Sequence, residues 1–356
     1  MQKLNETTRL SGEALAQAWQ ELKTAEPRLR IRNAAEKLGV SELELLATEV
    51  GKTATWLRPD FQEMFHEFHK MEKVMGLTRN DHVVIERKGV FREISFFNAH
   101  KMGQVVGHDI DLRMFMAQWK HCLAVRVASK GKVRNSLQIF SADGLAAFKI
   151  YTVPGSNEEA YEELVKAYTA EEQPNTVEVT PPSTGRPVRE DLSDLDVDQL
   201  HKEWSAMEDT HEFFGILRKH KLTRLQAAQV IGDSFALQLQ EDAMDTLLEV
   251  AAKEEVPIMA FVGNAHNIQI HTGPVKKIAR MDQWLNVLDP DFNLHVDTDQ
   301  VGHAWIVKKP TMDGIVTGVE FYDKNGEMMV QFFGKRKPGL PELTEWRALV
   351  EQLPRK

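Results

Sequence analysis

The two halves of this chain resemble each other, and this internal repeat limits the folds open to it. The first half contains MFHEFHKMEKVMGLTRND and the second contains DTHEFFGILRKHKLTRLQ. Aligned on the shared Leu-Thr-Arg, His66 falls on His211 and Arg79 falls on Arg224, because both pairs are 145 positions apart. Markers that recur in one order over so long a period indicate a duplicated domain, whereas solenoid repeats are much shorter.

Further markers extend the repeat toward the end of each half. FFNAH (96–100) is similar to VGNAH (262–266), and the Gln-Trp pair ending at Trp119 is similar to the one ending at Trp284. Two longer stretches each predict a strand, a glycine-containing turn and a second strand: LQIFSADGLAAFKIY (137–151) and VEFYDKNGEMMVQFF (319–333). Each half then closes on an amphipathic helical pattern, EEAYEELVKAY in the first and ELTEWRALVEQL in the second.

A stretch between the halves, EEQPNTVEVTPPSTGRPVREDLSD, is rich in proline, threonine and acidic residues and predicts an exposed linker. We therefore expect an N-terminal repeat over residues 1–172, a linker over 173–194 and a C-terminal repeat over 195–356. Within each half, helical patterns come before strand patterns. This segregation favours an α+β fold with antiparallel sheets and flanking helices. No GxGxxG or Walker sequence supports a nucleotide site.

Composition narrows the class of protein. The chain has 356 residues, of which 42% are hydrophobic and 27% charged, as in globular proteins. No apolar run approaches the roughly 18 to 20 residues that cross a bilayer, and the N-terminus lacks a signal-peptide core, so we expect no membrane insertion. A single cysteine, Cys122, rules out an internal disulfide framework and fits the cytoplasm. The net charge of −9 argues against a general affinity for nucleic acid.

Two local patterns in the first half have alternative interpretations. Residues 30–48, RIRNAAEKLGVSELELLAT, resemble a helix-turn-helix, but the second helix is acidic where DNA phosphates need lysine and arginine. A small helical cap is the favoured interpretation. His66 and His69 are spaced to share one helix face and could share a metal, yet no third ligand is evident. A structural or surface role is the favoured interpretation there too.

His211 lies in the stretch WSAMEDTHEFFGILRKHKLTR. Asp209 or Thr210 is the expected helix N-cap, which would place His211 in the first turn, in line with Phe214 and Arg218. Neutral imidazole is a good iron ligand, and adjacent aromatic rings would lie against a porphyrin face. On the pattern alone, a packed or surface histidine is the commoner outcome. Several cations that follow would suit ligand carboxylates: Arg218, Lys219, Lys221 and Arg224.

A second polar set comes near the C-terminus, in KKPTMDG and VQFFGKRKPG. On a strand, Gln331 and Phe333 would share one face and Phe332 would take the other. Arg336 would lie at the strand end, where anions are often bound, and Lys309 belongs to the same set. The alternative is a charged strand terminus that prevents edge-to-edge aggregation.

The segment GHDIDLRMFMAQW of the first half is expected to be helical. It places Arg113 among Met114, Phe115, Met116 and Trp119. An arginine among apolar residues either extends its charged end to solvent or points at a ligand.

Together these residues resemble one family, the two-repeat hemin-degrading or hemin-transport factors of the HemS/ChuS/HmuS type from Gram-negative haem-uptake systems. The resemblance runs nearly end to end. Its motifs are W-x-A-M-x-D-x-H-x-F-F around His211, D-L-R-x-F-x-x-Q-W around Arg113, and K-P-T-x-D-G and G-x-R near the C-terminus. It implies two similar halves with paired antiparallel sheets and outer helices, and one haem in a cleft between the halves.

The resemblance also implies roles for single residues. His211 would be the proximal iron ligand, Arg113 would reach the distal side, and Phe261 would help to wall the pocket. The family commonly has tyrosine where this chain has Phe333, so a hydroxyl is missing at the propionate end. His66 is not implied as the principal ligand. Four residues would meet the haem propionates: Arg224, Lys309, Gln331 and Arg336.

Two functions are compatible with this resemblance. In the first, the protein degrades imported haem oxidatively, opening the ring and releasing iron with electrons from an external donor, as a haem oxygenase-like oxidoreductase does. In the second, it is a haem carrier that takes haem from an inner-membrane importer and delivers it to a haem oxygenase. A reductase is a further expected partner of the enzyme. Both functions imply haem binding in the cytoplasm, and the sequence favours degradation without excluding the carrier.

Overall fold

The computed structural model describes residues 9–129, 132–181, 187–337 and 339–356. These residues form two compact units. Unit 1 comprises residues 1–77, 88–183 and 265–267, and unit 2 comprises residues 78–87, 184–264 and 268–356. Each unit therefore contains a short segment from the other half of the sequence. The predicted repeats, 1–172 and 195–356, are continuous stretches of sequence, whereas the two units are not. The predicted boundaries of the repeats stay a prediction.

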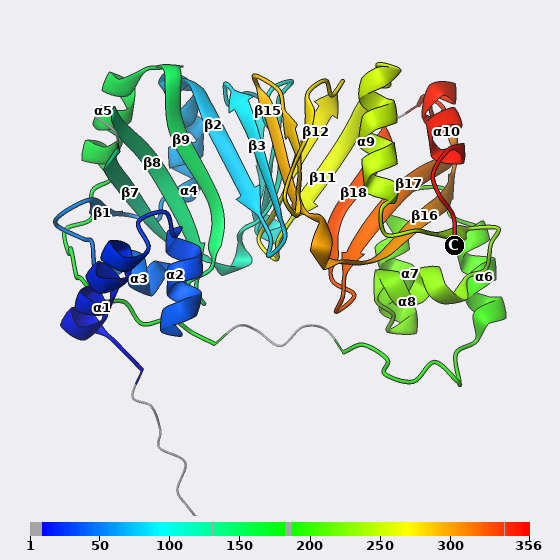
Figure 1. Cartoon of the computed structure of the whole chain (residues 1–356), viewed down its shortest axis with the longest axis horizontal. Helices are drawn as coiled ribbons and strands as arrows, with labels where there is room; N and C mark the ends of the chain where they lie inside the picture. Colours follow the sequence, from blue (N-terminus) through cyan, green and yellow to red (C-terminus); the bar gives the residue numbers. More distant parts are fainter. Residues whose placement is uncertain (1–8, 130–131, 182–186, 338) are drawn as a thin grey trace, which may run out of the picture. The chain divides into compact units, whose positions relative to one another are not determined.

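Unit 1 combines helices with two antiparallel groups of strands (Figure 1). One group has the order β1-β7-β8-β9-β2, and the other is the meander β4-β5-β6. The elements are α1 (Gly12–Ala25), α2 (Ile31–Leu38), α3 (Glu42–Ala47), β1 (Ala54–Leu57), α4 (Phe61–Glu67), η1 (Phe68–Met71), β2 (Glu72–Arg79), β4 (Ile94–Phe97), η2 (Asn98–His100), β5 (Met102–Val106), β6 (Asp111–Phe115), η3 (Met116–Gln118), β7 (Trp119–Ser129), β8 (Lys132–Ser141), β9 (Ala146–Ser156) and α5 (Glu158–Tyr168).

Unit 2 is built in the same way. Its strands follow the orders β10-β16-β17-β18-β11-β12 and β3-β15-β14-β13. The elements are β3 (Val83–Gly89), α6 (Val197–Ser205), α7 (Glu212–His220), α8 (Arg224–Val230), β10 (Ala236–Leu239), α9 (Ala243–Lys253), β11 (Ile258–Gly263), β12 (Asn267–Gly273), β13 (Ile278–Met281), β14 (Trp284–Leu288), β15 (Phe292–Asp297), η4 (Thr298–Gln300), β16 (Val301–Thr311), β17 (Gly314–Asp323), β18 (Met328–Gly334) and α10 (Thr344–Glu351). The predicted α+β class with antiparallel sheets and flanking helices is confirmed.

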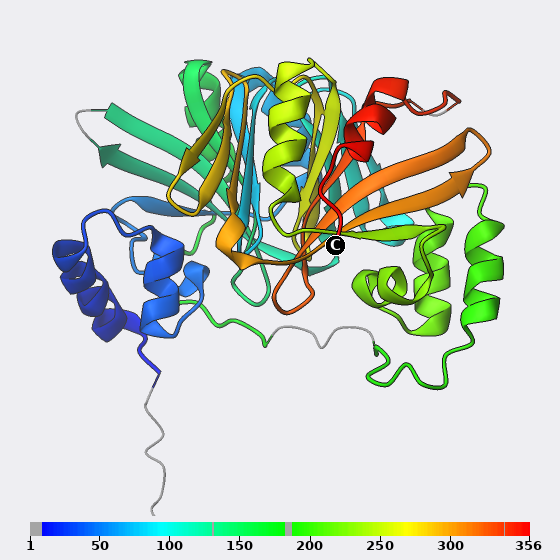
Figure 2. The same cartoon turned by 45° about the vertical axis from the view of Figure 1, so that its right-hand side comes forward.

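The sheet of unit 2 separates two cores because strand side chains alternate between faces. On β17, Val319 and Phe321 face the core that contains α9 and α10. Tyr322 faces the core formed with α6, α7 and α8. Figure 2 shows these three short helices grouped beside the β16–β17 hairpin. The second of these cores is the one that positions the candidate site.

The two halves repeat with an offset of 182 positions, not 145. Helices α2 and α7 end on left-handed caps at Gly39 and Lys221 (221 − 39 = 182). Helices α3 and α8 both start on a capping box, at Ser41 and Thr223. Strand β1 pairs with β7 as β10 pairs with β16, and the following elements recur in the same order. The matches of the β8–β9 and β17–β18 hairpins and of the two closing helices, α5 and α10, are correct.

The predicted alignment of His66 with His211 is therefore wrong. His66 lies in α4, whereas His211 precedes α7, and these helices are not repeat partners. The shared Leu-Thr-Arg is part of strand β2 in the first half, but in the second it joins α7 to α8. The other two early matches fail similarly, since Trp119 begins β7 and Trp284 begins β14. The FFNAH stretch spans β4 and η2, whereas the VGNAH stretch joins β11 to β12.

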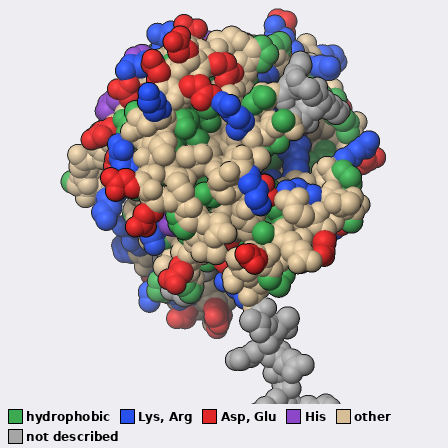
Figure 3. Space-filling model, turned by 90° about the vertical axis from the view of Figure 1, so that its left-hand side faces the viewer, with side chains coloured by type: hydrophobic (Ala, Val, Ile, Leu, Met, Phe, Trp, Pro, Cys, Tyr) green, Lys and Arg blue, Asp and Glu red, His purple; other side chains and the backbone are tan. Residues whose placement is uncertain are grey.

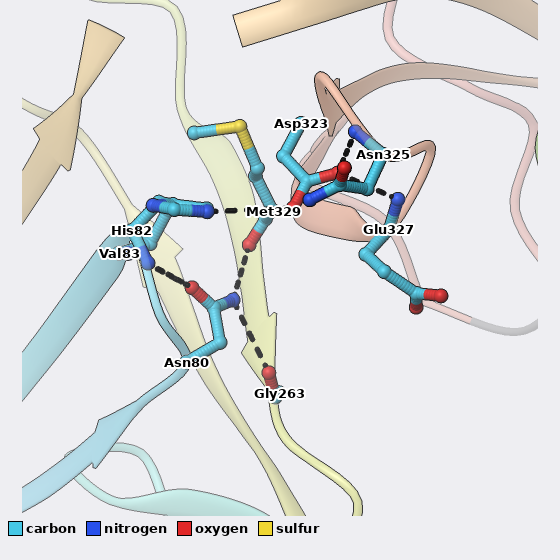
Figure 4. A network of polar contacts seen from close by, with 8 residues as sticks. All are labelled: Asn80, His82, Val83, Gly263, Asp323, Asn325, Glu327 and Met329. Atoms are coloured by element: carbon cyan, nitrogen blue, oxygen red, sulfur yellow. Dashed lines mark hydrogen bonds and ion pairs between the residues drawn. The ribbon is translucent and has the colours of Figure 1, made fainter. Parts of the chain in front are cut away.

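Residues 78–87 come from the first half of the sequence but belong to unit 2. Hydrogen bonds and an ion pair hold this segment in unit 2 (Figure 4). Asn80 Nδ2 donates to the carbonyl oxygens of Gly263 at 3.3 Å and Met329 at 2.8 Å. His82 Nε2 lies 3.3 Å from Asp323 Oδ2. Asp323 Oδ1 accepts the N–H groups of the β17–β18 turn, at residues 325 and 327. Residues 78–87 are thus tied to β11, β18 and that turn.

The predicted linker contacts both units where the structure describes it. Gln173 Oε1 accepts the Trp56 backbone N–H at 2.9 Å, and Trp56 Nε1 donates to the Pro174 carbonyl at 2.7 Å. At its other end the Arg189 N–H donates to the Lys221 carbonyl at 2.7 Å. Residues 182–186 of the linker and the first eight residues of the chain lie outside the described residues. No helix of the described chain is long and apolar enough to span a membrane.

The helix-turn-helix-like segment is a helical cap. Five of the six residues of α3 are buried. The Glu44 carboxylate accepts the backbone N–H of Ser41 and so completes the capping box at the start of this helix. Glu42 forms a buried ion pair with Lys149 of β9. A helix buried on this scale has no free face for a DNA groove. On the face of the molecule in Figure 3, basic and acidic side chains intermingle and form no large basic patch.

Candidate functional site

A buried carboxylate, Glu320 of β17, brings together three of the residues predicted for ligand binding. Its Oε1 lies 3.3 Å from Arg224 Nη1, 3.3 Å from Lys309 Nζ and 2.7 Å from Gln331 Nε2. Its Oε2 accepts a hydrogen bond from the Tyr322 hydroxyl. Glu320 is 1% exposed and Lys309 is 4% exposed, so this cluster lies inside the unit. We call these five residues the Glu320 cluster.

Burial and mutual charge control the ionisation of the Glu320 cluster. Burial lowers the pKa of Lys309 to about 8, although the Glu320 carboxylate acts to raise it. Burial alone would raise the pKa of Glu320, but Lys309 and Arg224 hold it below its usual value. Burial, and then the neighbouring Glu320 carboxylate, raise the pKa of Tyr322 well above its usual value. Two cations and one carboxylate leave the cluster with one net positive charge near neutral pH.

Helix α7 connects this cluster to the neighbourhood of His211. The ring of Phe213, two residues after His211, lies 4.3 Å from Lys309 Nζ and 5.3 Å from the guanidinium carbon of Arg224. The ring of Phe214 lies 4.7 Å from the same guanidinium carbon and is 49% exposed. Such cation–π contacts hold the cations against the aromatic side of α7.

The face of the sheet beside the cluster carries two further predicted residues. Phe261 of β11 and Phe333 of β18 meet edge to face, with ring centroids 5.3 Å apart. Phe261 lies opposite Gln331 in the strand register. Gly318 lies opposite Phe333, and a Cβ at Gly318 would come within 2.7 Å of that ring. The glycine therefore lets the Phe333 ring lie close to β17.

His211 is itself the N-cap of α7, which corrects the prediction that it lies in the first turn. Asp209 Oδ1 accepts the His211 backbone N–H at 2.7 Å and the ring Nδ1–H at 2.6 Å. With Nδ1 as donor, Nε2 carries the lone pair that can bind a metal. The His211 side chain is 89% exposed, so it is accessible to a ligand.

The turn between β16 and β17 lies against the Asp209 loop. The Met312 N–H donates to the Glu208 carbonyl at 3.0 Å, and the Met312 side chain is 82% exposed. Asp313 Oδ2 lies 3.8 Å from Arg336 Nη2. The hydrogen bonds from His211, followed by the more distant charge of Arg336, lower the pKa of Asp209. Arg336 is thus placed just beyond β18, as predicted, but beside a carboxylate.

Arg113 lies on strand β6 and not on a helix, which corrects the sequence-based prediction. The segment pairs with β5, where Arg113 lies opposite Gln104. The alternation of buried Leu112 and Met114 with half-buried neighbours has the period of a strand, and Met116 starts only a short 3-10 helix. Arg113 belongs to unit 1, where it pairs with Asp111 and donates to the Leu112 carbonyl at 3.0 Å.

Unit 1 does not repeat the chemistry of the Glu320 cluster. The positions 182 residues earlier hold Glu42 in place of Arg224 and Lys149 in place of Gln331, and these two form a buried ion pair. Gln138 takes the place of Glu320, and Leu29 that of His211. The remaining counterparts are Val127 for Lys309, Phe140 for Tyr322 and Tyr151 for Phe333. The charges of the ion pair cancel, so the net positive charge is particular to unit 2.

His66 of α4 and His69 of η1 are arranged differently from a metal site. His69 Nδ1 lies 2.7 Å from the His66 carbonyl oxygen, so one ring nitrogen is already engaged with the backbone. The His66 ring packs edge to face on Phe96 with centroids 5.4 Å apart. Among the described residues, no group of three or more histidine, cysteine, aspartate or glutamate side chains is arranged to hold a metal ion.

Glu320 and Tyr322 were missed by reasoning from the sequence. Both lie in GVEFYDKNG, where their alternation with Val319 and Phe321 was visible. An acidic residue at such a position is most often solvated. A signal was present, however, because the same face of the hairpin also carries Lys309 and Gln331, which would need a buried counter-charge if helices covered it.

Comparisons with known proteins agree with the repeat and identify its family. The model of the haemin-degrading HemS.ChuX domain matches residues 39–168 and 221–353. The two matches start 182 positions apart, as do the structural repeats. The hemin transport protein HmuS of Yersinia pestis is 33% identical over 340 residues, which cover 96% of this chain and 97% of that protein.

Solved structures give similar matches over almost the whole chain. Holo-PhuS, a heme-binding protein from Pseudomonas aeruginosa, is 42% identical with a TM-score of 0.93, covering 96% of this chain and 99% of that chain. ChuS of Escherichia coli O157:H7, a heme degrading enzyme, is 30% identical with a TM-score of 0.87, covering 96% of this chain and 98% of that chain. Another structure of ChuS describes it as a heme oxygenase.

Proposed function

The chain belongs to the haemin-degrading HemS.ChuX family, and from this premise we propose that it binds haem through His211 and degrades it oxidatively in the cytoplasm. One observation carries the proposal. An exposed histidine with its Nδ1 bonded to Asp209 precedes the helix whose Phe213 contacts Lys309 and Arg224. A histidine that can bind iron, two aromatic rings and a net positive cluster therefore lie along one side of α7 within one unit.

The residues suit the chemistry of haem as a ligand. Nε2 of His211 would bind the iron, and the exposed Phe214 and Met312 offer apolar surface to the ring. Burial of a porphyrin face stabilises binding by several kcal/mol at about 25 cal/mol per Å². The propionates would be met by the polar residues of the site, assisted by Phe261 and Phe333 as packing surface: Arg224, Lys309, Gln331 and Arg336.

The proposed reaction uses haem as substrate. An external donor supplies electrons and dioxygen supplies the oxygen that is inserted at a ring carbon, so that the ring opens to a linear tetrapyrrole and iron is released. Asp209 keeps His211 in the tautomer that binds iron. Arg113 would contribute a charged hydrogen-bond donor to the oxygen chemistry.

The second candidate is a haem carrier, which is favoured by the transport name of the Yersinia pestis relative. A carrier would take haem from an inner-membrane importer and deliver it to a haem oxygenase. It would need the same iron ligand and propionate site, but no turnover. The name of ChuS as a heme degrading enzyme favours the first candidate.

An anaerobic hemin titration followed by visible spectroscopy tests binding. We expect a Soret band that saturates at one hemin per chain and that His211→Ala changes or abolishes. Dioxygen, a chemical reductant and catalase are then added, catalase being present to remove stray peroxide. Bleaching with iron release supports the enzyme, and a persistent Soret band supports the carrier.

Two outcomes would contradict the assignments of residues. An unchanged spectrum and rate in His211→Ala would remove His211 as the iron ligand. For Arg113→Ala we expect nearly normal binding with slower ring opening. Equal loss of binding and turnover would make Arg113 a structural residue. No Soret change with wild-type protein would overturn the proposed function.

A further inference from the structure

Lys309 has an unusual environment for a lysine that is to bind an anion. Its side chain is buried, and its Nζ lies 3.3 Å from Glu320 Oε1 and 4.3 Å from the Phe213 ring centroid. The charged or titratable groups around it are Glu320 and Tyr322 on β17 and Arg224 on α8. A buried ammonium beside a guanidinium favours the neutral amine, because both desolvation and repulsion destabilise its charge.

Glu320 opposes both effects. Its carboxylate lies within ion-pair distance of Lys309, and it reaches Arg224 with the same oxygen, Oε1. The Tyr322 hydroxyl donates to the other oxygen, and Gln331 donates to the first. With donors on both oxygens, the carboxylate is stabilised in its charged form and fixed in one orientation.

From this geometry we propose that Glu320 is a positioning residue that keeps Lys309 protonated and holds it with Arg224 and Gln331 as one site for a single ligand carboxylate. The proposal rests on the proposed function, in which that carboxylate is a haem propionate. Glu320 itself does not touch the ligand. It acts through the charge and placement of the cations.

The restriction to one carboxylate follows from charge. Arg224 and Lys309 supply two positive charges and Glu320 removes one, so one anion neutralises the buried cluster. A second anion placed on the same cluster would leave an uncompensated buried charge, which is strongly unfavourable. The other ligand carboxylate would then be met outside the cluster, for which the less buried Arg336 is available.

The experiment compares hemin with hemin dimethyl ester, in which both carboxylates are blocked. The ratio of the two dissociation constants is measured from pH 6 to pH 9.5, so that effects on the iron and on its ligand cancel. For wild-type protein we expect hemin to bind at least about tenfold more tightly than the ester below pH 8, with the preference falling as Lys309 deprotonates above that pH.

Two variants isolate Glu320. In Glu320→Gln the side chain keeps its size and an acceptor oxygen but loses its charge, so Lys309 deprotonates at lower pH and the preference at pH 7.5 falls about tenfold. In Lys309→Arg the guanidinium remains charged, so the preference persists to pH 9.5. The double variant, Lys309→Arg with Glu320→Gln, should regain the preference for hemin over the ester at pH 7.5. Such a recovery would show that the loss in Glu320→Gln is not caused by unfolding.

Glu42→Gln in unit 1 is the matched control, because it also removes a buried carboxylate beside a lysine. It should keep the wild-type pH profile. Superimposable profiles for Glu320→Gln and wild type would overturn the proposal. The proposal would also be overturned if the preference of Lys309→Arg for hemin over the ester fell at the same pH as that of wild type. This variant remains informative if Glu320→Gln does not fold. Failure of wild-type protein to bind either hemin or its ester would instead overturn the proposed function.

Discussion

Asp209 Oδ1 accepts two hydrogen bonds from His211, one from the ring Nδ1 at 2.6 Å and one from the backbone N–H at 2.7 Å. One carboxylate oxygen therefore fixes both the start of α7 and the orientation of the imidazole. A metal-binding histidine is usually held in this way by a second residue, which also makes the ring a stronger donor.

Asp209→Asn is expected to lower hemin affinity about tenfold, because the amide can still accept both hydrogen bonds but no longer supplies charge. The reduction potential of bound haem should rise, since a less basic imidazole stabilises ferric iron less well. Hemin titration and a spectroelectrochemical measurement check this. Asp196→Asn, at the N-cap of α6, is the control and should leave both quantities unchanged. Equal values in Asp209→Asn and wild type would remove Asp209 from the iron site.

The elements that could be predicted from sequence are those fixed by local pattern. The hairpins β8–β9 and β17–β18 were recognised because strand alternation and a glycine turn occur together in both halves. The same alternation predicts opposite faces for Gln331 and Phe332, and the structure confirms this, because Phe332 packs in a core while Gln331 bonds Glu320 on the other face. The closing helices, α5 and α10, were likewise visible from their apolar spacing.

Hydrophobic alternation and helical spacing do not give the repeat offset or the Glu320 cluster. The shared Leu-Thr-Arg suggests an offset of 145 positions. The capping boxes at Ser41 and Thr223 indicate the correct offset of 182, because they mark equivalent helix starts. The apolar residues around Arg113 suggest a helix, but the buried ones, Leu112 and Met114, alternate with the period of a strand. Glu320 becomes significant only when α7 and α8 cover its strand, which is tertiary information.

Acid should destabilise unit 2 through His271. Burial, and then the charge of Arg87, lower the pKa of this histidine to about 3. Its Nδ1 lies 3.0 Å from Arg87 Nη1, and its ring stacks on the Phe292 ring with centroids 3.6 Å apart. The unfolded chain, with a histidine pKa near 6.5, binds the proton first, so stability from the neutral ring is present above about pH 6.5 and is lost as pH falls toward 3.

Between pH 7 and pH 5 this single group should lower the free energy of unfolding by about 2 kcal/mol. Urea unfolding at the two pH values measures the change. In His271→Gln the difference between pH 7 and pH 5 should shrink by about that amount, whatever the variant does to stability at pH 7. An unchanged difference would show that His271 takes up its proton in the folded protein.

Gly318→Ala should disturb the site from within the sheet. The new Cβ would meet the Phe333 ring at 2.7 Å, so the ring must move away from β17 and from Phe261. Overpacking of this kind destabilises by about 1–3 kcal/mol. We expect weaker hemin binding together with lower stability. Adding Phe333→Leu, which removes the clashing ring edge, should restore stability but not affinity. A Gly318→Ala protein with wild-type stability and affinity would contradict this account of the glycine.

The two capping boxes offer a comparison within one molecule. Thr223 accepts the Gln226 N–H at 3.0 Å, and Ser41 accepts the Glu44 N–H at 3.2 Å, at equivalent helix starts. Replacing either by alanine should cost about 1 kcal/mol of stability. Only Thr223→Ala should also weaken hemin binding, by severalfold, because α8 begins at Arg224 and a frayed first turn would release that guanidinium from Glu320. Thermal unfolding and hemin titration separate the two effects, and equal affinities in both variants would show that the start of α8 does not control Arg224.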